Sequence, residues 1–282
     1  MEHMIKMAGF DLDGTLLTDR KELTSRTRKA LEKAIQKGVI VLVATGRPWM
    51  GVPEELQNLQ GIRYALTSNG ARVIDTGRNK VLFEHLLEPG PAKKALEICG
   101  KYDTLQEIYF DGQGYAQAEK MKYVERYHRN PSMWEYTRKT RIPVEDLYSL
   151  LEQENRGLDK VQALFADMDE RRRAWEELSM EEDLELVGSL GYNIEINARG
   201  VNKGTALVEL GRMLGIKREE IMACGDGDND TAMLREVGFG VAMGNAEEEI
   251  KQAADYVTLT NEDEGVAYAI EKFILGGGEG VC

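Results

Sequence analysis

Six consecutive apolar residues, most of them β-branched, occupy positions 39–44 with the sequence Val-Ile-Val-Leu-Val-Ala. A strand with one solvated face alternates apolar and polar residues, whereas an unbroken apolar run indicates a strand covered on both faces, as in a parallel sheet between helices. Helical spacing precedes this run at 25–37 and ends at Gly38, and an earlier apolar run at 4–10 stops at Asp11. The order strand, helix, strand predicts a doubly wound, mainly parallel α/β sheet.

The two ends of the chain share this pattern, and the middle departs from it. Near the C-terminus the spacing predicts helices at 203–214 and 229–237 and strands at 221–224 and 239–243. In the middle it predicts helices at 91–102, 144–153 and 169–180 and strands at 106–110, 160–165, 185–188 and 192–196. A chain of 282 residues exceeds one ordinary core. We therefore predict a Rossmann-like core formed by residues 1–83 and 198–282, interrupted by a second, inserted α/β domain at 84–197.

The net charge and the apolar runs limit the partners. A formal charge of -13 repels nucleic-acid phosphates and anionic lipid, so we expect no nucleic acid and no membrane partner. No run of 18 apolar residues occurs, and the N-terminus lacks the order of a signal peptide, which predicts a cytoplasmic protein. Cys99, Cys224 and Cys282 are far apart, which predicts reduced thiols. The sequence carries no indication of oligomeric state.

Two aspartates directly follow the first predicted strand, in the segment Phe10-Asp11-Leu12-Asp13-Gly14-Thr15-Leu16. Because ligands bind at the carboxyl edge of a parallel sheet, both carboxylates should face one crevice. Asp11 can attack phosphorus, and Asp13 can protonate the leaving alkoxide and later accept a proton from water. Mg²⁺ would relieve the repulsion between a carboxylate and a phosphate dianion. The pair therefore predicts phosphoryl transfer through an aspartyl-phosphate on Asp11.

Two weaker signals supply groups that bind phosphate. Thr45 and Gly46 follow the second strand, where a hydroxyl and an unobstructed N–H suit a phosphate oxygen. A Thr-Gly pair is also common where a strand simply turns into a loop, so this segment alone does not indicate a phosphate site. Lys203 stands at the predicted start of a helix, where free N–H groups already favour anions. We expect Lys203 to be the counter-charge for the phosphate and the nucleophile.

A fourth signal, Gly225-Asp226-Gly227-Asp228-Asn229-Asp230, follows the predicted strand at 221–224. Mg²⁺ takes hard oxygen ligands and commonly only one or two protein carboxylates, so Asp226 is the expected ligand. Asn229 is expected to donate to the phosphate or orient a water, and Asp230 to hold Lys203 or a metal-bound water. The spacing and terminal Glu of a calcium loop are missing.

With these motifs in order, the chain resembles the haloacid dehalogenase superfamily, and most closely its Cof-type branch, in which an α/β cap is inserted between the second and third motifs. Further matching segments are Arg47-Pro48, Ser68-Asn69-Gly70-Ala71, Asn202-Lys203-Gly204 and Met243-Gly244-Asn245-Ala246.

The resemblance implies a role for each matching position. Asp11 would be nucleophile and magnesium ligand, Asp13 acid and base with its backbone carbonyl on the metal, and Asp226 a magnesium ligand. Thr45 and Lys203 would contact phosphate. Residues matching Arg47, Asn69 and Asn229 are often near the substrate in this branch, and the cap would select the leaving group.

Other functions use similar residues. A phosphotransferase or phosphomutase has the same aspartate pair but returns the phosphoryl group to a sugar. A receiver-type signalling module also forms an aspartyl-phosphate, but lacks the second aspartate and the cap. A non-catalytic protein that binds a phosphorylated metabolite would have little reason to retain both Asp11 and Asp13. The sequence favours a Mg²⁺-dependent phosphatase for a small phosphorylated metabolite, such as a sugar phosphate or a cofactor-type phosphate.

Overall fold

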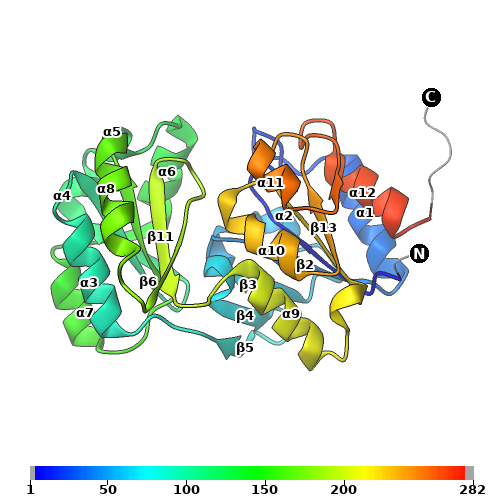
Figure 1. Cartoon of the computed structure of the whole chain (residues 1–282), viewed down its shortest axis with the longest axis horizontal. Helices are drawn as coiled ribbons and strands as arrows, with labels where there is room; N and C mark the ends of the chain where they lie inside the picture. The colour runs from blue at the N-terminus through cyan, green and yellow to red at the C-terminus, as the bar shows by residue number, and fades with distance from the viewer. Residues whose placement is uncertain (1–3, 277–282) are drawn as a thin grey trace. The chain divides into compact units, whose positions relative to one another are not determined.

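The computed structural model describes residues 4–276, and the chain divides into two compact units (Figure 1). Unit 1 comprises Met1–Glu84 and Asn202–Cys282, and unit 2 comprises His85–Val201. Each unit has its own sheet. Cys99 and Cys224 are buried free thiols, whereas Cys282 lies outside the described residues. No helix within residues 4–276 is both long and apolar enough to cross a membrane.

Unit 1 contains an eight-stranded sheet with the order β14-β13-β12-β1-β2-β3-β4-β5. Its strands are β1 (Met7–Phe10), β2 (Ile40–Ala44), β3 (Tyr64–Thr67), β4 (Arg72–Asp75), β5 (Lys80–Glu84), β12 (Ile221–Gly225), β13 (Phe239–Ala242) and β14 (Tyr256–Val257). The six strands from β14 to β3 are parallel, and β4 and β5 form an antiparallel hairpin at one edge. The predicted parallel α/β sheet is confirmed, with an edge hairpin that the sequence did not predict.

Helices cover both faces of this sheet. They are α1 (Ser25–Gln36), α2 (Glu54–Gln57), α9 (Lys203–Met213), α10 (Thr231–Glu236), α11 (Glu248–Gln252) and α12 (Gly265–Phe273). Helices α1 and α12 lie side by side (Figure 1) and share an apolar cluster with Val41 and Val43 of β2. Helix α9 packs in a second cluster with Leu42 and Ala44 of the same strand. Strand β2 therefore lacks polar alternation because both of its faces are buried.

The register of the central strands sets the place of the polar residues. Phe10, the last residue of β1, pairs with Val43 of β2 and with Cys224 of β12. The chain segments that leave these three strands therefore start at the same edge of the sheet. Because the strands are parallel, this is their carboxyl edge, where ligands bind in open α/β sheets.

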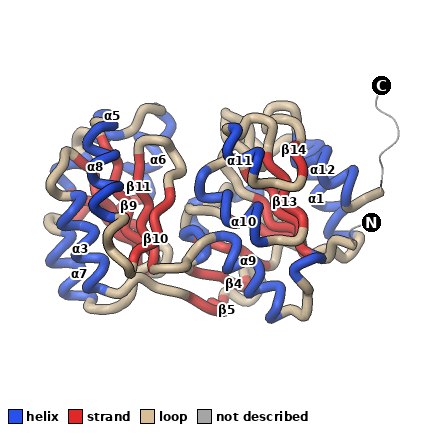
Figure 2. Tube along the Cα trace, viewed as in Figure 1, coloured by secondary structure: helices blue, strands red, loops and turns tan. Residues whose placement is uncertain are grey.

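Unit 2 contains a six-stranded sheet with the order β10-β11-β9-β6-β7-β8. Figure 2 draws its strands in red and labels β9, β10 and β11 among them. Its strands are β6 (Thr104–Phe110), β7 (Gln113–Gln117), β8 (Arg141–Val144), β9 (Lys160–Phe165), β10 (Leu184–Val187) and β11 (Asn193–Ala198). Its helices are α3 (Pro89–Cys99), α4 (Ala118–Met121), α5 (Val124–Tyr127), α6 (Pro131–Thr140), α7 (Leu147–Glu154) and α8 (Met168–Leu178). The sequence made no prediction for 111–143, where β7, α4 to α6 and all but the last residue of β8 lie.

The two faces of the unit 2 sheet differ in chemistry. Helices α3, α7 and α8 pack on a face made of apolar side chains such as Ile108 and Val161. The intervening residues of the same strands include buried charged groups. Arg141 Nε donates to Glu107 Oε2 at 2.9 Å, and Lys160 Nζ lies 2.5 Å from Glu195 Oε2. These charges are paired, as buried charges must be.

Candidate active site

A buried lysine joins two aspartates at the carboxyl edge of the unit 1 sheet. Asp11 follows β1, and Lys203 is the first residue of α9, whose start is capped by the Asn202 side chain. Lys203 is fully buried, and its Nζ lies 2.7 Å from Oδ1 of Asp11 and 2.7 Å from Oδ1 of Asp230. Burial lowers the pKa of Lys203, but the two carboxylates outweigh it and hold that pKa above its ordinary value. The two carboxylates therefore favour the charged form of Lys203.

The segment after β12 is folded by its own backbone around Asp230. Oδ2 of Asp230 accepts hydrogen bonds from the backbone N–H of Asp226 and of Gly227, both at 3.0 Å. Asp226 in turn accepts a hydrogen bond at 2.6 Å from the hydroxyl of Thr15. The two oxygens of Asp230 are thus engaged by Lys203 and by the loop, and Asp226 faces the segment that follows Asp11.

Three carboxylates in this cluster have the geometry and chemistry of a cation site. Asp11, Asp226 and Asp230 each offer an oxygen, and these oxygens lie within 4.8 Å of one another. Burial, followed by repulsion from Asp230, raises the pKa of Asp226 to about 7, and burial raises the pKa of Asp11 well above its ordinary value. Lys203 alone does not balance these charges. A divalent cation would, and carboxylate oxygens are ligands that hard cations such as Mg²⁺ accept.

Gly14 leaves room for this cluster. Its φ of +87° is in the left-handed region, and a Cβ placed there would lie 2.3 Å from Oδ2 of Asp226. Asn245 reaches the same place, because its Nδ2 donates to the backbone oxygen of Gly14 at 2.9 Å. The glycine therefore serves both the turn and the close approach of Asp226.

The second aspartate of the pair is held by two cations. Arg47 donates from Nε to Oδ2 and from its terminal nitrogen to Oδ1 of Asp13, each at 2.7 Å, and Lys21 Nζ lies 2.7 Å from Oδ1. Burial raises the pKa of Asp13, but the charges of Arg47 and then Lys21 outweigh it, so the pKa of this carboxyl lies below its ordinary value. The two cations therefore favour the ionised form of Asp13, which is the form that acts as a base.

The remaining predicted residues follow β2, β3 and β12. Thr45 is buried directly after β2, and its hydroxyl oxygen accepts from the N–H of Arg47 at 3.1 Å, with Gly46 between them. Asn69 follows β3 with φ +61°, and its Oδ1 accepts from Nδ2 of Asn229 at 3.2 Å. The backbone N–H of Asn69 also donates to the Thr45 oxygen at 3.0 Å. The hydrogen bonds thus connect the predicted residues in two sets: one around Lys203, and one that runs from Asp13 through Arg47 and Thr45 to Asn69 and Asn229.

Sequence reasoning missed three side chains that support this site. Thr15 and Asn245 lie in the quoted motifs without an assigned role, and both contact Asp226. Lys21 lies in no quoted motif. A glycine or asparagine would have indicated the left-handed turn that brings this loop back to Asp13. Here the left-handed residue is Lys21 itself, with φ +65°, so the sequence gives no such indication.

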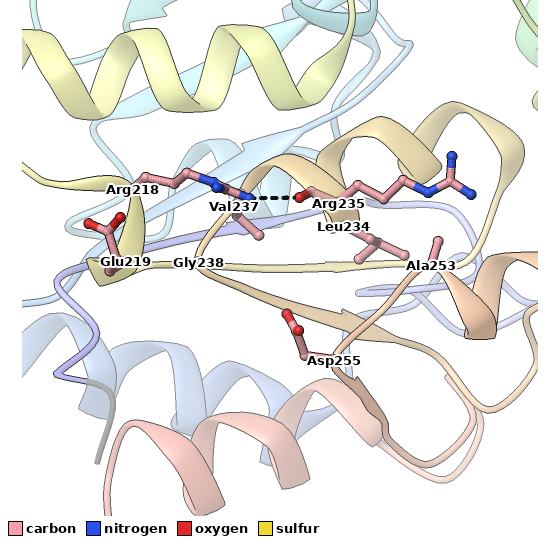
Figure 3. Close-up of a pocket in the computed structure, with 8 residues that line it drawn as sticks. All are labelled: Arg218, Glu219, Leu234, Arg235, Val237, Gly238, Ala253 and Asp255. Carbon is pink, nitrogen blue, oxygen red and sulfur yellow. Dashed lines mark hydrogen bonds between the residues drawn. The ribbon is translucent and has the colours of Figure 1, made fainter. Parts of the chain in front are cut away.

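A hollow elsewhere in unit 1 is unrelated to these carboxylates. It has a volume of about 320 Å³ and is lined by Arg218, Glu219, Leu234, Arg235, Val237, Gly238, Ala253 and Asp255 (Figure 3). Glu219 and Gly238 precede β12 and β13, so the hollow lies at the amino edge of the sheet. Arg218 donates to the backbone oxygen of Arg235 there at 3.0 Å.

The chain is similar along nearly its whole length to known proteins. Residues 9–270 match the sequence model of a family described as haloacid dehalogenase-like hydrolase. The 5-amino-6-(5-phospho-D-ribitylamino)uracil phosphatase YcsE of Bacillus subtilis (strain 168) is 34% identical over 271 residues, which cover 96% of each chain.

Two solved structures extend the comparison to the fold. A haloacid dehalogenase-like hydrolase from B. subtilis superposes with a TM-score of 0.84 at 29% identity, covering 95% of this chain and 99% of that one. A sugar phosphatase of HAD subclass IIB superposes with a TM-score of 0.78 at 26% identity, covering 95% of this chain and 98% of that one.

Proposed function

Because the chain belongs to the haloacid dehalogenase-like hydrolases, we propose that it is a Mg²⁺-dependent phosphatase that forms an aspartyl-phosphate on Asp11. That it is a phosphoric monoester hydrolase follows from the family and from relatives that are themselves phosphatases. The metal and the mechanism are the proposal. One observation carries it: the buried Lys203 lies between Asp11 and Asp230, beside Asp226 and its carboxylate oxygens.

In the first step the Asp11 carboxylate attacks phosphorus, and the bond between phosphorus and the ester oxygen breaks. The departing alkoxide takes a proton from Asp13, which is ionised before the substrate binds and takes up that proton once the dianionic phosphate brings further negative charge beside it. Lys203 holds the Asp11 carboxylate in place and provides a positive charge next to the phosphoryl oxygens of the bound substrate. Thr45, Gly46, Arg47, Asn69 and Asn229 follow neighbouring strands at this edge and are the proposed contacts of the phosphate and the adjoining part of the substrate.

In the second step Asp13, now ionised, removes a proton from water as the water oxygen attacks phosphorus. The bond between phosphorus and Asp11 breaks, which releases orthophosphate and restores the Asp11 carboxylate. When bound by Asp11, Asp226 and the backbone carbonyl of Asp13, Mg²⁺ supplies charge neutralisation for the phosphoryl group. Asp230 does not contact the phosphoryl group in this mechanism; it holds the Lys203 ammonium and the Asp226 backbone N–H in place.

The proposed substrate is a small phosphorylated metabolite, either a sugar phosphate or a cofactor-type phosphate. The relative from B. subtilis is named for a phosphorylated ribitylamino-uracil, and one structural relative is a sugar phosphatase. The phosphorylated ribitylamino-uracil and a sugar phosphate both carry a phosphate on a polyhydroxylated carbon chain. Unit 2, inserted between Glu84 and Asn202, is the proposed cap that selects the leaving group.

The test is orthophosphate release from p-nitrophenyl phosphate, sugar phosphates, nucleotides, flavin mononucleotide and pyridoxal phosphate, with Mg²⁺ or with a chelator. We expect Mg²⁺-dependent turnover, lost by about 10³-fold or more in Asp11→Asn and nearly as much in Asp13→Asn. Asp169→Asn, which removes the same charge from an exposed position on α8, should leave turnover unchanged.

Each alternative has its own outcome in this experiment. Full activity in Asp11→Asn would end the proposed mechanism. Transfer of phosphate to an added sugar without orthophosphate release would indicate a phosphotransferase or phosphomutase. Binding of phosphorylated compounds without any turnover would indicate a metabolite-binding protein.

A further inference from the structure

Lys21 occupies a backbone conformation that few lysines adopt. Its φ is +65°, in the left-handed region that non-glycine residues rarely enter. The turn is closed by hydrogen bonds from Lys21 N to the Thr18 oxygen at 2.8 Å and from Thr18 N to the Glu22 oxygen at 3.0 Å. Non-glycine residues in this region collect at functional sites, where the surrounding structure holds them in place. The left-handed conformation of Lys21 therefore indicates that its side chain has a function at this position.

The side chain reaches the second aspartate of the pair. Nζ of Lys21 lies 2.7 Å from Oδ1 of Asp13, and each side chain is 33% exposed. Arg47 binds both oxygens of the same carboxylate. Asp13 therefore accepts three charge-assisted hydrogen bonds from two separate segments of the chain, one after β2 and one in the loop that follows Asp13 itself. Such bonds are shorter and stronger than neutral ones and fix a carboxylate in orientation.

We propose that Lys21 is a positioning residue that holds the Asp13 carboxylate in the orientation needed to take a proton from water when the aspartyl-phosphate is hydrolysed. This inference rests on the proposed function. Arg47 fixes the Asp13 carboxylate from the segment after β2. Lys21 fixes the same carboxylate from the loop that follows Asp13. Lys21 does not touch the phosphoryl group in this proposal, so it acts only through Asp13.

The proposal separates the two chemical steps. With p-nitrophenyl phosphate the departing nitrophenolate needs no proton, so formation of the aspartyl-phosphate should not depend on Lys21. Hydrolysis of that intermediate needs Asp13 as a base and should slow. Since kcat/KM reports the steps up to the first irreversible one, Lys21→Met should lower kcat and leave kcat/KM nearly unchanged.

The experiment is stopped-flow hydrolysis of p-nitrophenyl phosphate by the full chain with Mg²⁺. For Lys21→Met we expect kcat to fall about 10- to 100-fold, kcat/KM to stay within about twofold, and a burst of about one nitrophenolate per active site. Lys21→Arg, which keeps a cation, should recover most of kcat. Arg20→Met removes the same charge from the exposed neighbour of Lys21 and should behave as the unmodified chain.

A double-variant comparison completes the test. In an Asp13→Asn background, Lys21→Met should have no further effect, because residues that act through one another are not additive. Equal losses of kcat and kcat/KM without a burst, or an undiminished effect in the Asp13→Asn background, would overturn the proposal. Absence of hydrolysis by the unmodified chain would instead refute the phosphatase function itself.

Discussion

Nζ of Lys203 lies 2.7 Å from Oδ1 of Asp11, although the two residues are 192 positions apart in the chain. The lysine is fully buried, and it bonds Asp230 at the same distance. Removing one member of a buried ion pair leaves the other charges without compensation, which costs more than the pair itself contributes. The contact therefore links the stability of unit 1 to its proposed chemistry.

Lys203→Met should lower both stability and turnover. Two buried carboxylates would lose their cation, so we expect the free energy of unfolding to fall by roughly 3–5 kcal/mol. Turnover should fall by about 100-fold or more, since a preorganised charge at the phosphoryl group is removed. Urea unfolding and phosphate release measure the two effects. Lys29→Met, at an exposed position on α1, is the control. A stable Lys203→Met variant would contradict the coupling.

Gly14→Ala should weaken metal binding more than it weakens the fold. The new methyl group would lie 2.3 Å from Oδ2 of Asp226, which must then move. We expect the Mg²⁺ concentration for half-maximal activity to rise about tenfold or more, a cost of about 1.4 kcal/mol. Gly38→Ala is a matched control, because Gly38 has nearly the same φ, +89°, and nothing within 4 Å of the added carbon. An unchanged Mg²⁺ requirement would place the metal away from Asp226.

Arg141→Met should destabilise unit 2. Arg141 Nε donates to Oε2 of Glu107, and both side chains are buried. The Tyr109 hydroxyl also donates to Oε2, and within residues 4–276 no hydrogen-bond partner is found for Oε1, so the positive charge of Arg141 is what offsets the buried carboxylate. We expect a loss of about 3–5 kcal/mol in urea unfolding. Arg138→Met, which breaks an exposed pair with Glu125, should cost under about 1 kcal/mol. Equal losses of unfolding free energy in the two variants would show that the buried ion pair stabilises unit 2 no more than the exposed one.

His128 should make unit 2 less stable in mild acid. Burial lowers the pKa of His128 to about 4, from an ordinary value of 6.5. Between these values the unfolded chain binds a proton that the folded chain does not, so stability falls as pH drops from 6.5 to 4, by about 3 kcal/mol in all. His128→Gln should therefore flatten the pH dependence of unfolding over this range. His85→Gln, at an exposed position, should leave it unchanged. Parallel pH profiles for all three proteins would contradict the shift.

The sequence predicted the central sheet because burial on both faces leaves a strong signal. Val41 and Val43 pack on one face of β2 while Leu42 and Ala44 pack on the other, so the strand is apolar throughout. The polar residues at its end are then conspicuous. The same reasoning placed Asp11 and Asp226 directly after two strands of one sheet, and the structure shows that these two strands are neighbours.

Segment 111–143 could not be predicted because its elements carry weak patterns. The inward residues of β7 are Gly114 and Ala116, which are too small to mark a buried face. Strand β8 contains Pro143 and lies at the sheet edge, where proline is tolerated. Helices α4 and α5 have four residues each, which is little more than one turn.

The contacts of Asp13 were beyond sequence reasoning for a different reason. Its contact with Lys21 depends on one left-handed residue, and its contact with Arg47 on the path of the chain after β2. Such contacts follow from backbone geometry and leave no periodic pattern in the sequence.

Strand β1 lies between β2 and β12, and β12 begins at Ile221. During synthesis the ribosome therefore makes all of His85–Val201 before β12, the second partner of β1, exists. Domains fold as units while the nascent chain emerges. The inserted unit can complete its own sheet while one edge of β1 is still unpaired. Asp11 can therefore contact Lys203 and Asp226 only after about four fifths of the chain has been made.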